Sequence, residues 1–184
     1  MPISTREIRT TIEDYLLRHP EETGRLEPVT SLLAQAQEPV SRLTLPGHVT
    51  VNAILLNAAD QVLHIKHVAL GRWLTPGGHC EPEDSSLAGA ALRELAEETG
   101  IPAEAVEPLA GFAGRPIDID VHAIPANEKN GEPEHWHYDF RFVFRAKAGT
   151  DVGQLQAEEV TDSAWFALAD TASPDVVRKL GPLV

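Results

Sequence analysis

Strict alternation of apolar and polar residues marks two segments in the second half of the chain, and this period of two is typical of half-buried β-strands. Residues 135–145 alternate most strongly, and their aromatic side chains share one face (Trp136, Tyr138, Phe140, Phe142 and Phe144). We expect that aromatic face to lie in the core. Residues 117–124 alternate in the same way, so both segments are predicted to be strands whose other face is polar and ionisable.

The polar faces of these strands meet if the strands pair as an antiparallel hairpin centred on the bond between residues 129 and 130. That register places three pairs opposite each other: His122 with His137, Asp120 with Asp139, and Asp118 with Arg141. Two facing aspartates destabilise a sheet unless a positive group lies nearby. We therefore expect this face to line a substrate cleft, with His135, His137 and Asp139 contacting the substrate or an additional cation. The alternative is a solvated sheet face.

Two earlier runs rich in apolar and branched residues, 48–57 and 62–68, flank Asn57-Ala58-Ala59-Asp60, which predicts a β-hairpin. His64 and His67 fall on opposite faces of the second run. They cannot bind one metal ion together without a bulge, and we expect both at the surface or at a sheet edge. Trp73 precedes a glycine turn and is expected in the core, with stacking on a base as the alternative. Residues 163–166 are expected to form a last strand.

Helical periodicity and end signals mark four further segments. Residues 4–19 begin with a capping-box pattern, Ser4 with Glu7, and residues 28–37 begin with a first-turn proline. A C-terminal helix is predicted to start at Ser173-Pro174 and to end at Gly181-Pro182. The first two helices carry no chemical motif, and we expect them to pack on the main domain. A lid or a contact between two copies of a homodimer is the alternative.

The fourth helical segment, residues 87–99, is bounded by the cap candidates Asp84, Ser85 and Ser86 and by Gly100. Its carboxylates Glu94, Glu97 and Glu98 stand at positions i, i+3 and i+4, so they share one face. These like charges repel each other and also lie near the negative end of the helix dipole. A hard divalent cation with oxygen ligands would relieve both effects. The alternative is a plain solvated acidic face.

The turn before this helix, Thr75-Pro76-Gly77-Gly78, lets the backbone approach a ligand closely. Turn and helix together resemble the signature of the Nudix hydrolase family, G-x5-E-x7-R-E-U-x-E-E-x-G-U, in which U is a bulky aliphatic residue. Residues 93–101, RELAEETGI, match the second half at every specified position. Gly78 lies one residue too far from Arg93, so the lone Glu of the signature falls on Asp84 or Ser85. A helix cap is the simpler account of that position.

This resemblance runs from about residue 48 to residue 168 and implies an α/β fold of the Nudix type, an α/β/α sandwich with a mixed sheet. We expect residues 46–184 to form the Nudix hydrolase domain and residues 1–45 to form an N-terminal helical extension packed on it. The resemblance also implies that Glu94, Glu97 and Glu98 bind Mg²⁺ or Mn²⁺, with a carbonyl of Gly77 or Gly78 as a further ligand. Glu98 and Glu94 are the first choices for catalysis, and Arg93 is expected to orient a glutamate. The general base is expected among Glu158, Glu159 and Glu134.

The reaction implied by the resemblance is hydrolysis of a diphosphate bond in a nucleoside diphosphate linked to another moiety. One alternative is a non-catalytic Nudix-fold sensor that binds a nucleotide without turning it over, which the three clustered carboxylates disfavour. Another is an isomerase on the same fold in which Cys80 acts with a glutamate, but a lone cysteine is more often inert than catalytic.

The 184 residues suit one ordinary domain with a small appendage. A formal charge of −13 argues against a nucleic-acid polymer as partner, because no basic stripe can neutralise a phosphate backbone. Metal ions could still attract a small nucleotide-like diphosphate substrate. Cys80 is the only cysteine, which indicates a reducing compartment. Charged residues within positions 1–20 and the lack of any membrane-length apolar run predict a soluble cytoplasmic protein with no membrane partner.

Overall fold

The computed structural model describes residues 2–35, 38–127, 131–171 and 173–184. Its main helices and strands follow in chain order: α1 (Thr5–Arg18), α2 (Glu27–Ala34), β1 (Gly47–Leu56), β2 (Gln61–His67), β3 (Arg72–Leu74), β4 (Gly77–His79), α3 (Leu87–Thr99), β5 (Val106–Pro108), β6 (Asp118–Ile124), β7 (His135–Ala146), β8 (Val160–Ala167) and α4 (Pro174–Leu180).

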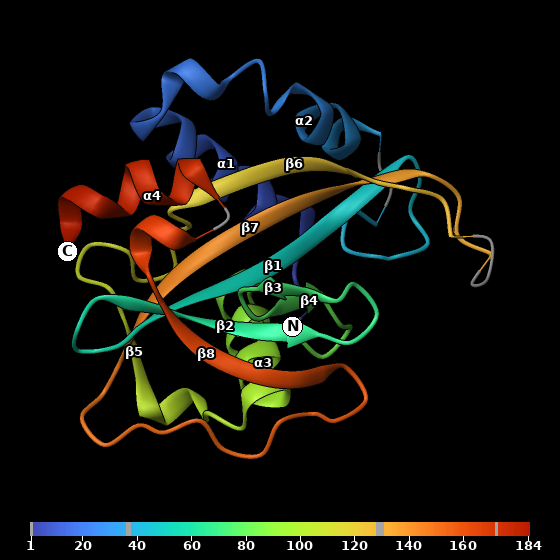
Figure 1. The fold of residues 1–184 in the computed structure, drawn as a ribbon. Coiled ribbons are helices and arrows are strands. Elements are labelled where there is room, and N and C mark those ends of the chain that lie inside the picture. Colours follow the sequence, from blue (N-terminus) through green and yellow to red (C-terminus); the bar gives the residue numbers. More distant parts are fainter. Residues whose placement is uncertain (1, 36–37, 128–130, 172) are drawn as a thin grey trace.

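Within the described residues these eight strands form one mixed sheet with β1 at its centre (Figure 1). β1 runs parallel to β7 along its whole length, from Gly47 beside Trp136 to Leu56 beside Arg145. On its other side, β1 pairs antiparallel with β4 near its start and with β2 at its end. α1, α2 and α3 share one core cluster with Val49 and Val51 of β1, whereas α4 packs against Ile54 and Leu56, whose side chains point to the other face of the sheet. The predicted α/β/α sandwich with an N-terminal helical pair is therefore confirmed.

The predicted register between β6 and β7 is also confirmed. The two strands pair antiparallel, with His122 opposite His137 and Asp120 opposite Asp139. Asp118 lies opposite Arg141. The bond between residues 129 and 130, about which we centred the hairpin, lies outside the described residues. β7 pairs with β6 on one side and with β1 on the other, so the polar faces of three strands lie next to each other.

The helix α3 has the limits that its end signals predict. Ser86 caps its start, where the Ser86 hydroxyl accepts a hydrogen bond from the Gly89 amide. Gly100 ends it in the left-handed conformation, with φ of 68°. Leu87, Ala90, Ala91 and Leu95 are buried in the main core with β1 and β7, so the glutamates face away from that apolar stripe.

The apolar residues form two clusters on the sheet. The larger cluster joins α1, α2 and α3 to alternate residues of β1 and β7, among them Val49, Val51, Tyr138 and Phe140. The smaller cluster lies where α4 packs on the sheet and contains Ile54, Leu56, Ile117, Val143, Val176 and Leu180. Because successive residues of a strand point to opposite faces, the core residues of β1 leave His48, Thr50 and Asn52 on the other face of the sheet.

The N-terminal helices pack against the rest of the fold. Ser4 caps α1 as predicted, but the Glu7 side chain does not return to Ser4. It accepts a hydrogen bond of 3.0 Å from the Leu87 amide at the start of α3, so α1 helps to cap α3. The second helix, expected over residues 28–37, covers Glu27–Ala34, and residues 36 and 37 lie outside the described residues. A domain boundary near residue 45 stays a prediction.

Two expectations about burial are wrong. His64 is only 3% exposed, because β2 is an inner strand flanked by β3, β8 and β1, and its ring packs edge-on against Phe166. Trp136 is 40% exposed, although its face of β7 is otherwise buried. It pairs with Gly47, the first residue of β1, at one end of the parallel pairing between β1 and β7. Among the helices that the structure describes, none has the length and apolar character needed to cross a membrane.

Candidate active site

The glycine turn brings α3 close to the sheet. Gly78 lies in β4, and a Cβ atom there would come within 2.7 to 2.8 Å of the Glu94 carboxylate. At Gly77 a Cβ atom would come within 2.5 Å of the Val51 carbonyl oxygen. At Gly77 only glycine fits, since the neighbouring atoms belong to the backbone, whereas a side chain at Gly78 would have to displace the Glu94 carboxylate. The absent side chains leave a cradle in which a helix carboxylate meets the backbone of β4.

Glu98 is the most firmly placed of the predicted metal ligands. It is 2% exposed, and its Oε2 accepts a hydrogen bond of 2.9 Å from the Gly77 amide. Burial raises the pKa of Glu98 to about 8, and the charges of Glu94 and Glu159 add to the effect. Burial likewise raises the pKa of Glu94 to about 7, although Arg93 opposes the change. A bound cation would favour the ionised form of both carboxylates and would release their protons.

Arg93 contacts three acidic residues around the turn and the helix. Its Nη1 lies 3.1 Å from Glu94 Oε1 and 2.7 Å from Glu97 Oε2. Its Nη2 donates to the His79 carbonyl oxygen at 2.8 Å. The other half of the guanidinium binds Asp84 with two hydrogen bonds, Nε to Oδ1 at 3.0 Å and Nη2 to Oδ2 at 2.9 Å. The expectation that Asp84 or Ser85 caps the helix is wrong, because Ser86 is the cap and Asp84 anchors Arg93.

The remaining acidic candidates are less enclosed. The Glu97 side chain is 48% exposed and points to Arg93, so its place among the metal ligands stays a prediction. Glu134 and Glu158 are exposed. Glu159 is exposed too, but its charge raises the pKa of both Glu94 and Glu98, which places Glu159 near the cluster. The charge of Glu159 is thus among the main influences on these carboxylates.

Cys80 offers little support for thiol chemistry. The side chain is half-buried, and burial raises the pKa of the thiol to about 12, with Asp84 adding to the shift. The thiolate is the reactive form of cysteine, so a thiol that stays protonated is a poor nucleophile. The isomerase alternative loses its chemical basis at neutral pH.

The polar face of β6 and β7 contains the positive group that the facing aspartates need. Arg141 reaches three carboxylates: Nη1 lies 3.1 Å from Asp118, Nη2 lies 2.9 Å from Asp120, and Nε lies 3.0 Å from Asp139. Asp139 is 8% exposed, and its other oxygen accepts a hydrogen bond from Thr50. Its two oxygens are thus already bound within the sheet. A contact between Asp139 and a substrate stays a prediction.

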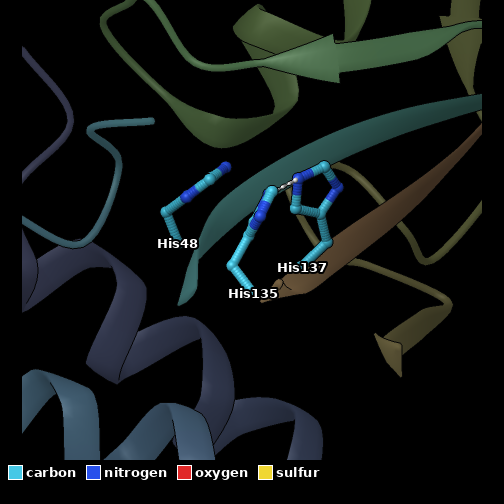
Figure 2. A group of neighbouring side chains, drawn as sticks. All are labelled: His48, His135 and His137. Carbon is cyan, nitrogen blue, oxygen red and sulfur yellow. Dashed lines mark hydrogen bonds between the residues drawn. The ribbon is translucent and has the colours of Figure 1, made fainter. Parts of the chain in front are cut away.

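Both predicted histidines lie on the same face, and the fold adds two that sequence reasoning missed. His135 and His137 meet at 3.2 Å between their Nε2 atoms, and His48 from β1 lies beside them (Figure 2). His79 from β4 approaches His48 at 3.1 Å between Nε2 atoms. The strand register explains why these four rings lie together. His48 is the parallel partner of His137, and His79 pairs with Thr50, two residues after His48 on β1.

Comparison with known proteins identifies the family of the chain. The family model of the NUDIX domain matches residues 46–183. The chain belongs to the Nudix family. A Nudix protein of Lactococcus lactis described as a probable DHNTP pyrophosphohydrolase is 30% identical over 120 residues, which cover 65% of this chain and 63% of that protein. The Nudix hydrolase NudL of Citrobacter koseri, described as uncharacterized, is 34% identical over 64% of this chain and 60% of its own length.

Each match to these two Nudix relatives thus spans less than two thirds of the relative's own length. Among solved structures, the Ap4A hydrolase of C. elegans matches 73% of this chain and 96% of its own, with a TM-score of 0.50 and 19% identity. That likeness concerns the Nudix fold alone. The curated matches and the family model together support the predicted family.

The oxygen donors of this Nudix site fit a hard divalent cation. Glu94 and Glu98 are carboxylates in a largely buried setting that disfavours their ionised form, and both lie close to the backbone of the β4 glycines. Mg²⁺ and Mn²⁺ prefer this kind of ligand.

Proposed function

We propose that the protein is a metal-dependent hydrolase of a diphosphate bond in a nucleoside diphosphate linked to another moiety. The observation that carries this proposal is the buried Glu98 carboxylate, held on the Gly77 amide at 2.9 Å beside Glu94. The raised pKa values of Glu94 and Glu98 mean that both carboxyls are only partly ionised at neutral pH, and a cation close by would favour their ionised form.

Glu94 and Glu98 would hold Mg²⁺ or Mn²⁺, with Glu97 and a carbonyl of Gly77 or Gly78 as further ligands. When bound, such an ion neutralises phosphate oxygens and lowers the pKa of a water molecule. Arg93 keeps Glu94 in place and is itself held by Asp84. Glu159 is our first choice to accept the proton of the attacking water, with Glu158 as the second.

The substrate would be small. The charge of −13 disfavours a long phosphate backbone, and the Lactococcus lactis relative is described as a probable DHNTP pyrophosphohydrolase. We propose that the substrate lies against the polar face of β7, near His135, His137 and Asp139. A half-buried face with several hydrogen-bonding groups suits the polar parts of a nucleotide.

The proposal is tested with a panel of nucleoside diphosphate derivatives, in EDTA and then with Mg²⁺ or Mn²⁺. We expect no hydrolysis in EDTA, recovery with metal, and a fall in kcat by orders of magnitude for Glu98→Gln, because a charged ligand is lost. Without metal, Glu98→Gln should keep or slightly raise Tm, since a neutral amide avoids the cost of a buried carboxyl whose pKa is raised. The exposed variant Glu107→Gln serves as control.

Three results would contradict the assignment. Full activity in Glu98→Gln would remove Glu98 from the site, and unfolding of this variant would make it a structural residue. Metal-dependent binding of a panel member without any product, measured on the same samples, would favour the sensor.

A further inference from the structure

Outside the glutamate site, the described residues contain two groups of three side chains whose ligand atoms lie within 4.8 Å of one another. One is His48, His135 and His137. The other is His19, Glu21 and Glu22, but the Glu22 carboxylate already pairs with Lys179 at 2.7 Å and with Arg25. Two cations beside Glu22 disfavour a third, so the histidine group is the stronger candidate.

We propose that His48, His135 and His137, with His79 as fourth ligand, form a site for a transition metal ion of the Zn²⁺ class. We call these four residues the histidine cluster. Imidazole nitrogen suits Zn²⁺ and related ions, whereas Mg²⁺ and Ca²⁺ prefer oxygen. The cluster would therefore take a different ion from the glutamate site, and the proposal does not depend on the hydrolysis proposed above.

The spacing of the His48, His135 and His137 rings suits joint coordination of one ion, whereas His79 lies outside this three-residue group and would have to turn toward the ion to become its fourth ligand. With zinc–nitrogen bonds of about 2.0 to 2.1 Å, ligand nitrogens lie about 3.3 Å apart and ring centres about 5 Å apart. The Nε2 atoms of His135 and His137 are 3.2 Å apart, and those of His48 and His79 are 3.1 Å apart. Ring centres lie 4.8 Å apart for His48 and His137, 5.0 Å for His48 and His135, 5.1 Å for His135 and His137, and 5.2 Å for His79 and His137.

Hydrogen bonds on the outer sides of two rings orient their inner nitrogens. Nδ1 of His135 contacts the Pro133 carbonyl oxygen at 2.8 Å, and Nδ1 of His48 contacts the Thr44 carbonyl oxygen at 3.4 Å. A carbonyl oxygen only accepts, so Nδ1 carries the hydrogen in both rings and Nε2 keeps its lone pair. Metal-binding histidines are commonly held in this way by a backbone carbonyl.

The fold holds these rings rigidly on three strands of the sheet, β1, β4 and β7. His48 is 1% exposed and His135 is 7% exposed, while His79 and His137 are half-buried, so an ion could enter from their side. His122 also neighbours His137, at 5.6 Å between ring centres, but its Nδ1 pairs with Asp120. We therefore assign His122 to the surroundings of the site.

The alternative is a set of neutral rings that hydrogen-bond to each other without an ion. In that arrangement His137 would donate to His135, and His79 would donate to His48, across the same short distances. Both arrangements account for the distances, and they differ in metal content. Metal content is therefore the deciding measurement.

The test starts from the full chain, stripped with EDTA and equilibrated with excess Mg²⁺ so that the glutamate site is not open to other ions. Zinc is then added, and bound zinc per chain is measured by mass spectrometry after gel filtration. We expect about one Zn²⁺ per chain and, with Co²⁺ in its place, the visible absorption of a tetrahedral nitrogen site. His137→Gln should weaken zinc binding about 100-fold or more, since losing a residue that merely supports a ligand often costs 10- to 100-fold. His79→Gln should weaken it as well.

Three control variants show where the zinc is bound. His67→Gln changes a half-buried histidine of β2 outside the cluster, and His19→Gln changes the other three-residue group. Both should bind zinc as the wild type does. Glu98→Gln should also keep its zinc, which separates this site from the glutamate site. Circular dichroism checks that each variant is folded, and His137 is suitable for substitution because it is only half-buried.

The proposal is overturned if the wild type binds no zinc under these conditions, or if His137→Gln binds it with unchanged affinity. Loss of zinc in His19→Gln or Glu98→Gln, with retention in His137→Gln, would assign the ion to one of the other two sites. Unchanged zinc binding in His79→Gln would remove the fourth ligand from the assignment.

Discussion

Asp139 stands between the ion pairs of the polar sheet face and the histidine cluster. On β7 it stands two residues after His137 and two before Arg141, on the same face as both. Its carboxylate binds Arg141 and Thr50, so its immediate effect is to hold the Arg141 side chain. Asp139 could therefore affect a substrate in two ways, by contacting it directly and by holding the Arg141 side chain in place.

Replacing Asp139 by asparagine should raise KM several-fold and leave Tm little changed. Arg141 keeps Asp118 and Asp120 as partners in this variant, so the network loses one of its three carboxylates. Steady-state kinetics and thermal unfolding of Asp139→Asn, compared with Glu107→Gln, measure both effects. Kinetics equal to those of the control would make Asp139 a plain sheet residue, and a large fall in Tm would make it a structural one.

Individual residues show which contacts of the candidate site could be predicted from the sequence and which could not. The carboxylates of α3 could be placed on one face because helix geometry fixes neighbours at i+3 and i+4. The contact between Asp84 and Arg93 spans nine residues across the turn into the helix, and no local period predicts it. The signal was present: the lone Glu of the signature falls near Asp84, and an acidic residue opposite the signature arginine could have been read as its partner.

His48 and His79 were missed for a longer-range reason. They join His135 and His137 only because β1 pairs parallel with β7 and antiparallel with β4. The β6–β7 register followed from two neighbouring alternating segments, whereas a parallel pairing between strands about ninety residues apart leaves no local mark in the sequence. The register of β1 with both neighbouring strands would have been needed to find the four-histidine group.

At the scale of elements, buried charges join α1, the turn after it, β6 and α4. Lys179 from α4 lies 2.7 Å from Glu22 and 2.5 Å from Asp118, and it also contacts the Tyr15 hydroxyl. Arg25 contacts Glu22 and Asp118 from the other side. The Lys179 side chain is 3% exposed. This network fixes the N-terminal helices and α4 against the edge strand β6.

Replacing Lys179 by methionine should destabilise the protein by about 3 to 5 kcal/mol, because it leaves Glu22 and Asp118 short of a partner in a buried place. Arg178→Met, next in the chain and 55% exposed, should change stability little. Urea unfolding at pH 7 compares the two. Equal midpoints for both variants would mean that Lys179 does not hold these elements together.

Most elements could be predicted because each has its own period or end signals. The four helices and the strands β1, β2, β6, β7 and β8 appear where expected within a few residues. The strands β3, β4 and β5 have three residues each, too few to show alternation, and they form because longer strands offer them free edges. β4 matters most among them, since it carries Gly77, Gly78 and His79 to both candidate sites.

At the scale of the whole molecule, the formal charge of −13 means that acid should affect stability strongly. Burial alone would raise the pKa of Glu22, but hydrogen bonds from Lys179 and Tyr15 outweigh it and lower the pKa to about 2, against an ordinary value of 4.5. The folded protein thus holds the Glu22 proton more weakly than the unfolded chain does. The stabilisation from this group is complete above about pH 4.5 and is lost as pH falls toward 2.

Glu22→Gln should therefore be less stable than the wild type at pH 7 by up to about 3 kcal/mol, the free energy that corresponds to this pKa difference. The gap should close between pH 4.5 and 2, because the wild-type carboxyl then becomes neutral as well. Urea unfolding at several pH values measures it, with Glu21→Gln as the control, since Glu21 is the exposed neighbour. A gap that stays constant across this range would show that the charge of Glu22 is not what joins α4 to the N-terminal helices.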